Sequence, residues 1–530
     1  MENLLIARWI PIHRKNGIHE LIAPWQISDP DIISINSPRP DFDGAIIQFL
    51  IGLLQTTMTP KDEEEWGKNL EQAPSGEALK HSFTRVSHAF EVKGDNPQFM
   101  QDLEPLDVKS ANKISGLLIE APGGNTIKEN KDHFVKRSQI ESMCPACAIT
   151  ALLTLQTNAP SGGQGHRTSL RGGGPLTTLV VNDSNNSGLS DNLWTNLWLN
   201  VLDKSREHII TGDWSSSEES AIFPWMGKTK TSEKTTGIEV FPEDVHPDQM
   251  YWSMPRRIRI LWDETTIGNC DICNEYSEEL VSHYETKNYG VNYSGQWQHP
   301  LSPHSVNKEG EILPRHAQPD GMTYRHWLGL VKNVDTLFPA KVVARYQRVI
   351  ANFSQKNKEQ LRIRAFGYDM DNMKARCWYE TTFPLYELVD NNGVDISLYI
   401  GILTTTATDV ASMVRSCIKE AWFRRPGDAR GDTSFLQYAF FQYTEKPFYH
   451  SVEKLIKNTD DSEKQILNDW HQILRQSAYA LFDYWSDNGD FAQSDPKRIA
   501  KAHTELKKLL HSKKLLEALQ VAKRKKKEMA

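Results

Sequence analysis

No hydrophobic run in this sequence approaches the ~20 residues that a membrane-spanning helix needs. The best candidate, AIIQFLIGLL at 45–54, is about half that length and is typical of a buried core helix. The N-terminus lacks the basic segment, apolar stretch and small-residue cleavage site of a secretory signal. We therefore expect a cytoplasmic protein with no part in a membrane. Its 530 residues are too many for one hydrophobic core, and a typical domain of about 150 residues predicts two to four domains.

An excess of positive charge is also missing, since the net charge is −7. The chain therefore has no global field that would attract nucleic acid, and any contact with a polyanion has to use local patches. One such patch is the C-terminal segment 496–530, which carries twelve Lys and Arg residues against three Glu.

Familiar catalytic motifs are missing as well. The chain contains neither H-E-x-x-H nor G-x-S-x-G, and its glycine-rich stretch at 161–175 has no G-K-[ST] and no G-x-G-x-x-G frame. We therefore predict that the protein is not an enzyme. The alternative is a metal-dependent nuclease that uses Asp369 and Asp371 as metal ligands. Asp371 and Lys374 fit the carboxylate–lysine spacing of common nucleases poorly, which weakens that alternative.

Cysteine is scarce, and four of the six cysteines form two C-x-x-C pairs, Cys144 with Cys147 and Cys270 with Cys273. In a reducing compartment, such pairs bind metal or carry out redox chemistry more often than they form disulfides. Two pairs together supply the four thiolates that zinc takes in closed structural sites. The sequence therefore predicts a structural zinc site, provided that the fold bridges the 122 residues between the pairs. The alternatives are two unrelated pairs or one redox pair.

The pattern of apolar residues changes near residue 390. Residues 1–390 mix short alternating segments, apolar helices and many Gly, Pro and Asn turns, which predicts one large mixed domain. Residues 391–530 instead carry apolar residues every three or four positions, the period of a helix. Four helices with short connections predict an antiparallel four-helix bundle there. The expected fold class is α+β, with a mixed domain that holds the zinc site, followed by the bundle.

The spacing also predicts which side chains of the bundle face inward. In the first helix they are Ile396, Ile400, Leu403, Ala407, Val410, Val414, Cys417 and Ala421. A second helix starts near Ser434, and we expect Pro447 to kink or split it. The inward set of the third helix is Ile466, Trp470, Ile473, Ser477, Ala480 and Tyr484. The fourth helix begins at the N-cap Asp495, and its inward set is Ile499, Leu506, Leu510 and Leu516.

A glycine-rich segment, Ser161–Pro175, follows the first cysteine pair and reads SGGQGHRTSLRGGGP. Glycines allow a backbone to approach a ligand closely and to present its N–H groups. Arg167 and Arg171 would then hold phosphate groups. The segment predicts a binding loop for an anionic ligand, and the alternative is a flexible turn between a helix and a strand.

Alternating apolar residues at 361–365 and a second alternating run from Ala375 predict a β-hairpin over 361–380. Its tip contains Asn372 and Met373, which could push between stacked bases as the wedges of minor-groove proteins do. The alternative is a solvated turn.

Three further segments are weaker signals. The basic stretch KDHFVKRSQIESMC places Phe134 and Val135 where they could stack on unpaired bases, and the alternative is a loop anchored by one buried phenylalanine. His299 and His304 in HPLSPH resemble a ligand pair, but the prolines favour an ordinary loop. Lys308 stands at a turn in NKEGE, where a lysine is ordinarily solvated.

In their order along the chain, these pieces resemble one known family. It is the CasA family, the large subunits of the type I-E CRISPR surveillance complex Cascade. The resemblance starts at NLLIARWIPI, continues through FVK, CPAC, NAPSGGQGHRTSLRGGGPLTTLV, QWQHPLSPH and FGYDMDNMKARCWYE, and ends in the predicted bundle. The strings LRGG-x-P-x-TT and HP-x-SP are specific for the family, and the resemblance covers essentially the whole chain.

The resemblance implies a subunit without nuclease activity that recognises the protospacer-adjacent motif (PAM) of double-stranded DNA from the minor groove and opens the duplex. Its implied partners are the CRISPR RNA, the other Cascade subunits and a helicase-nuclease that it recruits. The implied PAM-binding residues are Gly163, Gln164 and Gly165 of a glycine loop, Lys308 as a lysine finger, and Asp371, Asn372 and Met373 at a wedge. The implied loop for the guide-RNA handle is Phe134, Val135 and Lys136.

Two residues depart from the family pattern. Asn372 stands where a glutamine is best known at the wedge, and Lys136 replaces the asparagine of the Phe-Val-Asn loop. PAM preference and contact with the guide RNA can therefore differ from those of other members.

Overall fold

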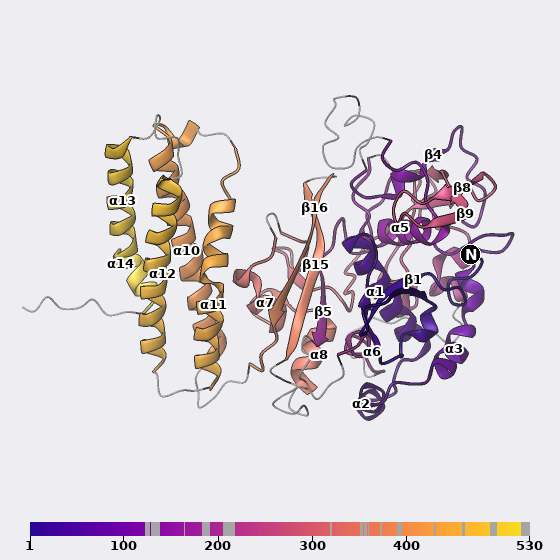
Figure 1. Cartoon of the computed structure of the whole chain (residues 1–530), viewed down its shortest axis with the longest axis horizontal. Helices are drawn as coiled ribbons and strands as arrows, with labels where there is room; N and C mark the ends of the chain where they lie inside the picture. The colour runs from indigo at the N-terminus through magenta and orange to yellow at the C-terminus, as the bar shows by residue number, and fades with distance from the viewer. Residues whose placement is uncertain are drawn as a thin grey trace, which may run out of the picture. The chain divides into compact units, whose positions relative to one another are not determined.

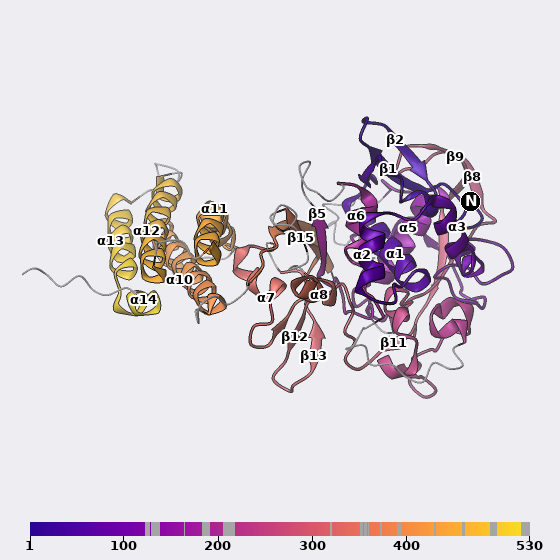
Figure 2. The same ribbon diagram turned by 90° about the horizontal axis from the view of Figure 1, so that it is seen from below.

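The computed structural model describes residues 1–121, 128, 138–163, 165–182, 191–204, 218–318, 321–349, 353, 358, 360–371, 374–388, 395–428, 431–457, 462–487 and 495–520. They form two compact units, Met1–Pro319 with Thr336–Leu385, and Asp320–Asp335 with Tyr386–Ala530. The first unit mixes helices with small sheets, and the second consists of helices (Figure 1, Figure 2). The predicted α+β fold class with a helical C-terminal part is therefore confirmed. None of the helices in the described part of the chain combines the length and the hydropathy needed to cross a membrane.

The first unit is built around α1 (Pro40–Thr57), and almost every residue of this helix is buried. Its apolar run is the AIIQFLIGLL segment, so the predicted core helix is confirmed. Phe49 of α1 packs edge-to-face against Phe90 and Trp252, with ring centroids 5.9 and 5.8 Å away. The helix that carries the first cysteine pair, α5 (Pro145–Asn158), packs beside α1.

One antiparallel sheet contains the predicted hairpin. In it, β5 (Thr177–Asn182) pairs with β15 (Leu361–Asp371), and β15 pairs with β16 (Lys374–Pro384). The alternating apolar residues at 361, 363 and 365 are buried, because successive side chains of a strand point to opposite faces. The hairpin is thus confirmed, with two residues in the turn between its strands.

The remaining strands of the first unit form small sheets. They are β2 (His19–Ile22), β1 (Ile10–Arg14) and β3 (Ile32–Ile35); β4 (Asn112–Lys113), β10 (His283–Lys287) and β7 (Arg257–Ile260); β11 (Asn292–Tyr293) and β6 (Glu239–Val240); β13 (Ile312–Pro314), β12 (His304–Val306) and β14 (Leu337–Phe338); and β8 (Thr265–Asn269) and β9 (Tyr276–Val281). Its shorter helices are α2 (Glu63–Glu71), α3 (Gly76–Thr84), α6 (Leu193–Trp198) and α8 (Lys341–Val349).

The second unit contains the bundle helices. They are α10 (Ile396–Trp422), α11 (Phe435–Lys457), α12 (Glu463–Asp487) and α13 (Pro496–Leu510), together with the short α7 (Leu328–Val331) and α14 (Lys513–Ala518). All eight predicted inward residues of α10 are buried. Near the end of α10, Arg415 donates to Gln437 near the start of α11 at 3.2 Å, and Ala421 accepts from Arg498 at the start of α13 at 2.9 Å. Both helices therefore run antiparallel to α10, as predicted (Figure 1).

Of the two effects predicted for Pro447, the split is wrong, because α11 runs through this residue without interruption. A proline in a helix removes one backbone donor from the carbonyl four residues earlier. That carbonyl belongs to Tyr443, a residue that is 58% exposed, so the lost hydrogen bond lies on the solvent side of the helix.

The predicted inward faces of the last two long helices are correct only in part. In α12, Ile466 and Trp470 are buried, but Ala480 and Tyr484 are exposed. The buried stripe continues instead through Leu474, Ala478 and Phe482, a series that buries larger apolar side chains than the predicted one does.

The fourth helix is shorter than predicted. It ends at Leu510, and α14 begins after Ser512, whose hydroxyl accepts from the N–H of Leu515 at 3.4 Å. This new start rotates the following residues, so that Leu515 is buried in place of Leu516. At the other end, the predicted N-cap is confirmed, because Asp495 accepts two backbone N–H groups of α13.

Candidate metal centre and nucleic-acid interface

Two stretches that are distant in the sequence bring four cysteines together. Cys144 and Cys147 lie at the start of α5, and Cys270 and Cys273 lie in the turn between β8 and β9. Figure 1 shows α5 beside these two strands. The four sulfur atoms lie within 4.8 Å of one another, and Cys144 Sγ is 3.8 Å from Cys273 Sγ. The predicted meeting of the two pairs is therefore confirmed, and the cluster could hold a metal ion.

The donor atoms of this cluster fit a tetrahedral ion. Four sulfur atoms at ~2.3 Å from a zinc ion would stand about 3.8 Å from one another. The N–H groups of Cys144 and Ile272 point at Cys270 Sγ from 3.2 and 3.4 Å, which favours a thiolate there. A hydrogen bond from Cys144 lowers the pKa of Cys270 and lowers that of Cys273 to about 7, whereas the same neighbour raises the pKa of Cys147. Without a cation, some of the four thiols therefore keep their protons. All four become thiolates only when a cation lies among them.

The second cysteine pair is positioned by a tight turn. Asn274 has a φ of 61°, which asparagine tolerates better than most residues, and its N–H donates to the carbonyl of Cys270 at 2.8 Å. The carboxylate of Asp271 accepts the N–H groups of Glu141 and Ser142, each at 2.8 Å. These bonds tie the turn to the residues just before α5 and thus bring one cysteine pair to the other.

The glycine-rich segment has unusual backbone conformations at two predicted site residues. Gly163 has a φ of 91°, and no described atom lies within 4 Å of the position that a Cβ would take. Gly165 has a φ of 77°, and a Cβ there would stand 2.8 Å from the backbone nitrogen of Tyr289. The carbonyl of Gly165 also accepts from that nitrogen at 2.7 Å. The first glycine therefore faces open space and the second is fixed against the protein, while Gln164 lies outside the described residues.

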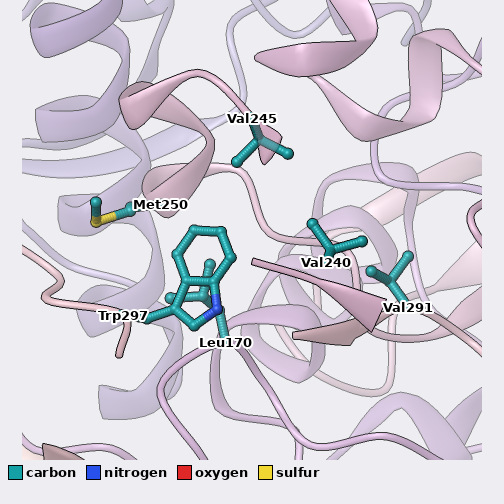
Figure 3. Packing of buried hydrophobic residues seen from close by; sticks show 6 residues of the cluster. All are labelled: Leu170, Val240, Val245, Met250, Val291 and Trp297. Carbon is teal, nitrogen blue, oxygen red and sulfur yellow. The ribbon is translucent and has the colours of Figure 1, made fainter. Parts of the chain in front are cut away.

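Leu170 anchors the glycine segment in the core. It belongs to a buried apolar cluster with Val240, Val245, Met250, Val291 and Trp297 (Figure 3). Arg167 adds a second anchor, because its Nε donates to Ser232 Oγ at 2.7 Å. Since Trp297 precedes the HPLSPH string, the cluster joins the glycine segment to that string.

The role predicted for Arg171 is wrong. This side chain is only 4% exposed and both of its terminal nitrogens already donate to side chains inside the protein, so it does not reach a ligand. It donates to Thr177 Oγ1 at 3.0 Å, to Ser302 Oγ at 3.1 Å and to Gln48 Oε1 at 2.5 Å. Burial lowers the pKa of Arg171 to about 9. The strings LRGG-x-P-x-TT and HP-x-SP thus meet at one buried arginine, which holds the glycine segment to α1 and β5.

The hairpin is held near its turn from two sides. Tyr368 of β15 donates to the buried carboxylate of Asp41 in the first turn of α1, at 2.5 Å. On the other side, a Cβ on Gly174 would stand 2.7 Å from Met370 Cγ, so the glycine segment packs closely against the hairpin. The end of the hairpin is therefore fixed to both the core helix and the glycine segment.

The carboxylates of the hairpin do not form a metal site. Asp369 is 3% exposed and accepts from Arg376 at 2.8 Å, so its charge is neutralised within the protein. Across the described ranges, the four cysteines are the only group of three or more potential ligands whose donor atoms lie close enough to share an ion. Asp371 is exposed at the end of β15, whereas Asn372 and Met373 lie outside the described residues. The nuclease alternative thus receives no support from this geometry.

Lys308 is exposed in the turn between β12 and β13. Asn307 closes this turn, because its backbone N–H donates to the carbonyl of Glu311 at 3.0 Å and its side chain donates to the Glu311 carboxylate at 2.8 Å. The strand after the turn leads to His316, and a Cβ on Gly172 would stand 2.6 Å from the Cε1 of that histidine. The base of the Lys308 hairpin therefore also packs against the glycine segment.

The two histidines of HPLSPH belong to the core and not to a ligand pair. His299 Nδ1 accepts from the N–H of Leu301 at 3.1 Å. Burial lowers the pKa of His304 to about 4 and places that of His299 well below its ordinary value. Both rings are therefore neutral at pH 7, which agrees with the ordinary-loop interpretation.

The glycine segment contacts both other elements of the predicted interface near their bases. Its Gly174 meets the hairpin, and its Gly172 meets the residue that follows the Lys308 hairpin. The predicted guide-RNA loop, Phe134, Val135 and Lys136, lies outside the described residues. The roles of this loop and of the two wedge residues in the hairpin turn stay predictions.

Comparison with protein families decides the assignment. Residues 3–481 match the family described as CRISPR-associated protein Cse1 (CRISPR_cse1). The chain belongs to the Cse1 family. The match includes every motif on which the predicted resemblance depends, and that resemblance is confirmed.

Solved structures with the Cse1 fold cover nearly the whole chain. The crystal structure of Thermobifida fusca Cse1 aligns with a TM-score of 0.71 at 14% identity, over 98% of this chain and 98% of that one. The structure of Thermus thermophilus CasA (Cse1) aligns with a TM-score of 0.68 at 14% identity, over 96% and 99%. A chain from a structure described as a CRISPR RNA-guided surveillance complex aligns with a TM-score of 0.68 at 15% identity, over 96% and 99%. At these identities the likeness concerns the fold.

Sequence reasoning missed the contacts that position the loops of this Cse1 family member. Tyr368 and Asp41 are 327 positions apart, and no motif marks them as a pair. Arg256 lies beneath Gly162, yet in the sequence it is indistinguishable from its neighbour Arg257. The available signal for Tyr368 was the alternation in β15. It places this side chain on the opposite face of the sheet from that of residue 369.

Proposed function

We propose that the protein is the DNA-recognition subunit of a CRISPR RNA-guided surveillance complex and performs no covalent chemistry itself. It reads the PAM of double-stranded DNA in the minor groove, separates the adjacent base pairs and lets the guide RNA pair with the freed strand. The observation that carries this proposal is the packing of the glycine segment against both the hairpin and the base of the Lys308 turn. Membership of the Cse1 family and the likeness in fold to a chain of a surveillance complex support it.

The glycine loop, Gly163, Gln164 and Gly165, would lie against the minor groove. A side chain at position 163 would occupy open space, so glycine there lets the backbone come closer to a ligand. The minor groove shows a degenerate pattern of donors and acceptors, in which A·T and T·A look alike. Backbone contacts together with one flexible lysine, Lys308, would therefore accept several PAM sequences.

The hairpin would act as the wedge, with Asp371, Asn372 and Met373 at its tip. Separating stacked base pairs costs a few kcal/mol per step, so a wedge has to resist being pushed back. Two observations support this role for the hairpin. Its strands are joined by two residues only, and Tyr368 ties it to the core helix close to that turn.

The other partners follow from the same proposal. Phe134, Val135 and Lys136 would contact the handle of the CRISPR RNA, and other surfaces would contact the remaining Cascade subunits. The exposed lysines of α13 provide a basic face that could hold the displaced strand; they are Lys497, Lys501, Lys507 and Lys508. After the duplex opens, the subunit would recruit a helicase-nuclease that destroys the DNA.

Zinc is the ion that we propose for the four cysteines. The set of four sulfur donors leaves no open coordination position, which is typical of structural zinc. The first pair begins α5, and the chain leaves the other end of α5 directly into the glycine segment. The cysteines would therefore fix the helix that presents the binding loop.

Binding of PAM-bearing duplex to the guide-loaded complex tests the proposal. The variants Lys308→Ala and Asn372→Ala should each weaken PAM-dependent binding about tenfold or more, and Lys109→Ala serves as a matched exposed lysine outside the interface. Binding that stays intact in both variants would refute the site assignment. Incubation of the isolated protein with duplex and magnesium should leave the DNA uncut, whereas cleavage that Asp369→Ala abolishes would establish the nuclease alternative.

A further inference from the structure

Buried arginines of the first unit differ in how their charge is balanced. Arg257 donates to Asp102 at 2.6 Å, and Arg345 donates to Asp203 at 3.0 Å. The neighbour of the first, Arg256, forms no ion pair with any Asp or Glu that the structure describes. Because a guanidinium keeps its proton in proteins, Arg256 carries a buried positive charge, and the acceptor of its hydrogen bond is a neutral carbonyl oxygen.

The guanidinium of Arg256 lies directly beneath the glycine segment. Arg256 is 8% exposed, and a Cβ on the exposed Gly162 would stand 2.7 Å from its Nη1. Nη2 donates to the carbonyl of Pro160, whereas Nε has no hydrogen-bond partner within the described ranges. Burial lowers the pKa of Arg256 to about 10, so the group stays charged at neutral pH. Only a glycine at position 162 leaves room for the guanidinium so close to the surface.

Two more arginines, the buried Arg171 of the segment itself and the partly buried Arg315, also have no carboxylate partner among the described residues. Arg171 is held by three neutral side chains, and Nη1 of Arg315 has no hydrogen-bond partner there. Burial lowers the pKa of both. Three guanidinium groups in or next to the segment therefore carry a charge that no described carboxylate balances, and a buried charge is costly unless an anion is paired with it.

We propose that Arg256 binds a backbone phosphate of the DNA duplex whose PAM lies on the glycine segment. This inference rests on the proposed function and adds a residue to it. The phosphate supplies the negative charge that the site lacks, and the planar guanidinium can donate two parallel hydrogen bonds to it. A phosphate contact carries no sequence information, so Arg256 sets the register of the duplex and leaves the choice of PAM to other residues.

A cycle that combines Arg256→Gln with single methylphosphonate substitutions tests the contact. Each methylphosphonate removes the charge of one DNA phosphate beside the PAM, and binding is measured with the guide-loaded complex. At one phosphate position, the methylphosphonate should weaken DNA binding by the wild-type complex about tenfold. The same methylphosphonate should leave DNA binding by the Arg256→Gln complex unchanged. The variant should also lower the slope of log affinity against log salt by about one, whereas Arg348→Gln, an exposed arginine of α8, should not.

The outcomes separate this inference from the proposed function. Equal losses for wild type and variant at every phosphate would overturn it, as would a variant that changes PAM preference without changing the salt slope. If Arg256→Gln fails to assemble, Arg256→Lys keeps the charge and should retain the coupling to the same phosphate; its loss at every position again overturns the inference. A wild type that does not distinguish PAM from non-PAM duplex would refute the proposed function itself.

Discussion

Replacing Gly165 by alanine tests whether the glycine loop is fixed against the protein, and Gly163 provides the matched control. Both residues have positive φ, 77° and 91°, so a Cβ at either position costs ~1–2 kcal/mol of backbone strain. At position 165 the Cβ would also stand 2.8 Å from the backbone nitrogen of Tyr289. Relieving that overlap adds ~1–3 kcal/mol. We expect Gly165→Ala to destabilise the first unit by roughly 2–5 kcal/mol, and Gly163→Ala by roughly 1–2 kcal/mol.

Thermal unfolding of the two variants, compared at the same transition, measures this difference. DNA binding by the guide-loaded complex should rank the variants in the opposite order. Gly163→Ala places a methyl group in open space where the duplex would approach, so its loss of PAM binding should exceed its loss of stability. Two variants that lose the same stability, to within about 0.5 kcal/mol, would show that the contact with Tyr289 does not fix the loop.

Three further perturbations address the metal cluster, the buried histidines and the hairpin. Cys270→Ser, or a strong chelator, should lower the unfolding temperature and release bound metal, as elemental analysis would show; an unchanged temperature would contradict a structural role. His304 has a pKa of about 4 in the folded protein and about 6.5 in the unfolded chain, so its stabilisation is complete above pH 6.5, is lost as the pH falls towards 4 and amounts to at most about 3 kcal/mol. His304→Gln should therefore reduce the dependence of the free energy of unfolding on pH in that window, as measured by urea denaturation. A pH dependence equal to that of the wild type would contradict the assignment. Tyr368→Phe removes a donor from the buried Asp41 carboxylate and should cost ~1–3 kcal/mol. It should also reduce duplex opening, reported by a fluorescent base analogue beside the PAM, more than it reduces duplex binding; equal losses would argue against a wedge.

The features that the sequence predicted correctly depend on local chemistry. The inward residues of α10 follow the helical period, and all of them are buried. The hairpin follows from alternation on either side of a short turn, and Asp495 caps α13 because an aspartate before Pro496 suits that position. Two C-x-x-C pairs were enough to predict a four-thiolate cluster from the number of donors, and the fold then showed that the two pairs meet.

The features that could not be predicted depend on contacts between distant segments. Arg171 follows leucine and precedes glycines, a context typical of an exposed loop, and only its three partners on separate segments show that it is buried. In α12 the period allowed two apolar stripes, and the sequence does not show which stripe its neighbours cover. Arg256 and Arg257 also look alike in the sequence. Only the folded chain shows that Arg257 has a carboxylate partner, Asp102.

The cysteine cluster has a consequence for how this fold is maintained. A metal ion shared by Cys144 and Cys273 would close a covalently continuous loop of roughly 130 residues, within which the glycine segment and Arg256 both lie. By chain statistics, such a closure restricts the unfolded ensemble by about 4–5 kcal/mol, as much as a disulfide of that span. Unlike a disulfide, it would form without an oxidant and open when the ion is withdrawn. As long as the cysteines stay reduced, the supply of the ion would then set the fraction of chains whose loop is ready to meet a ligand.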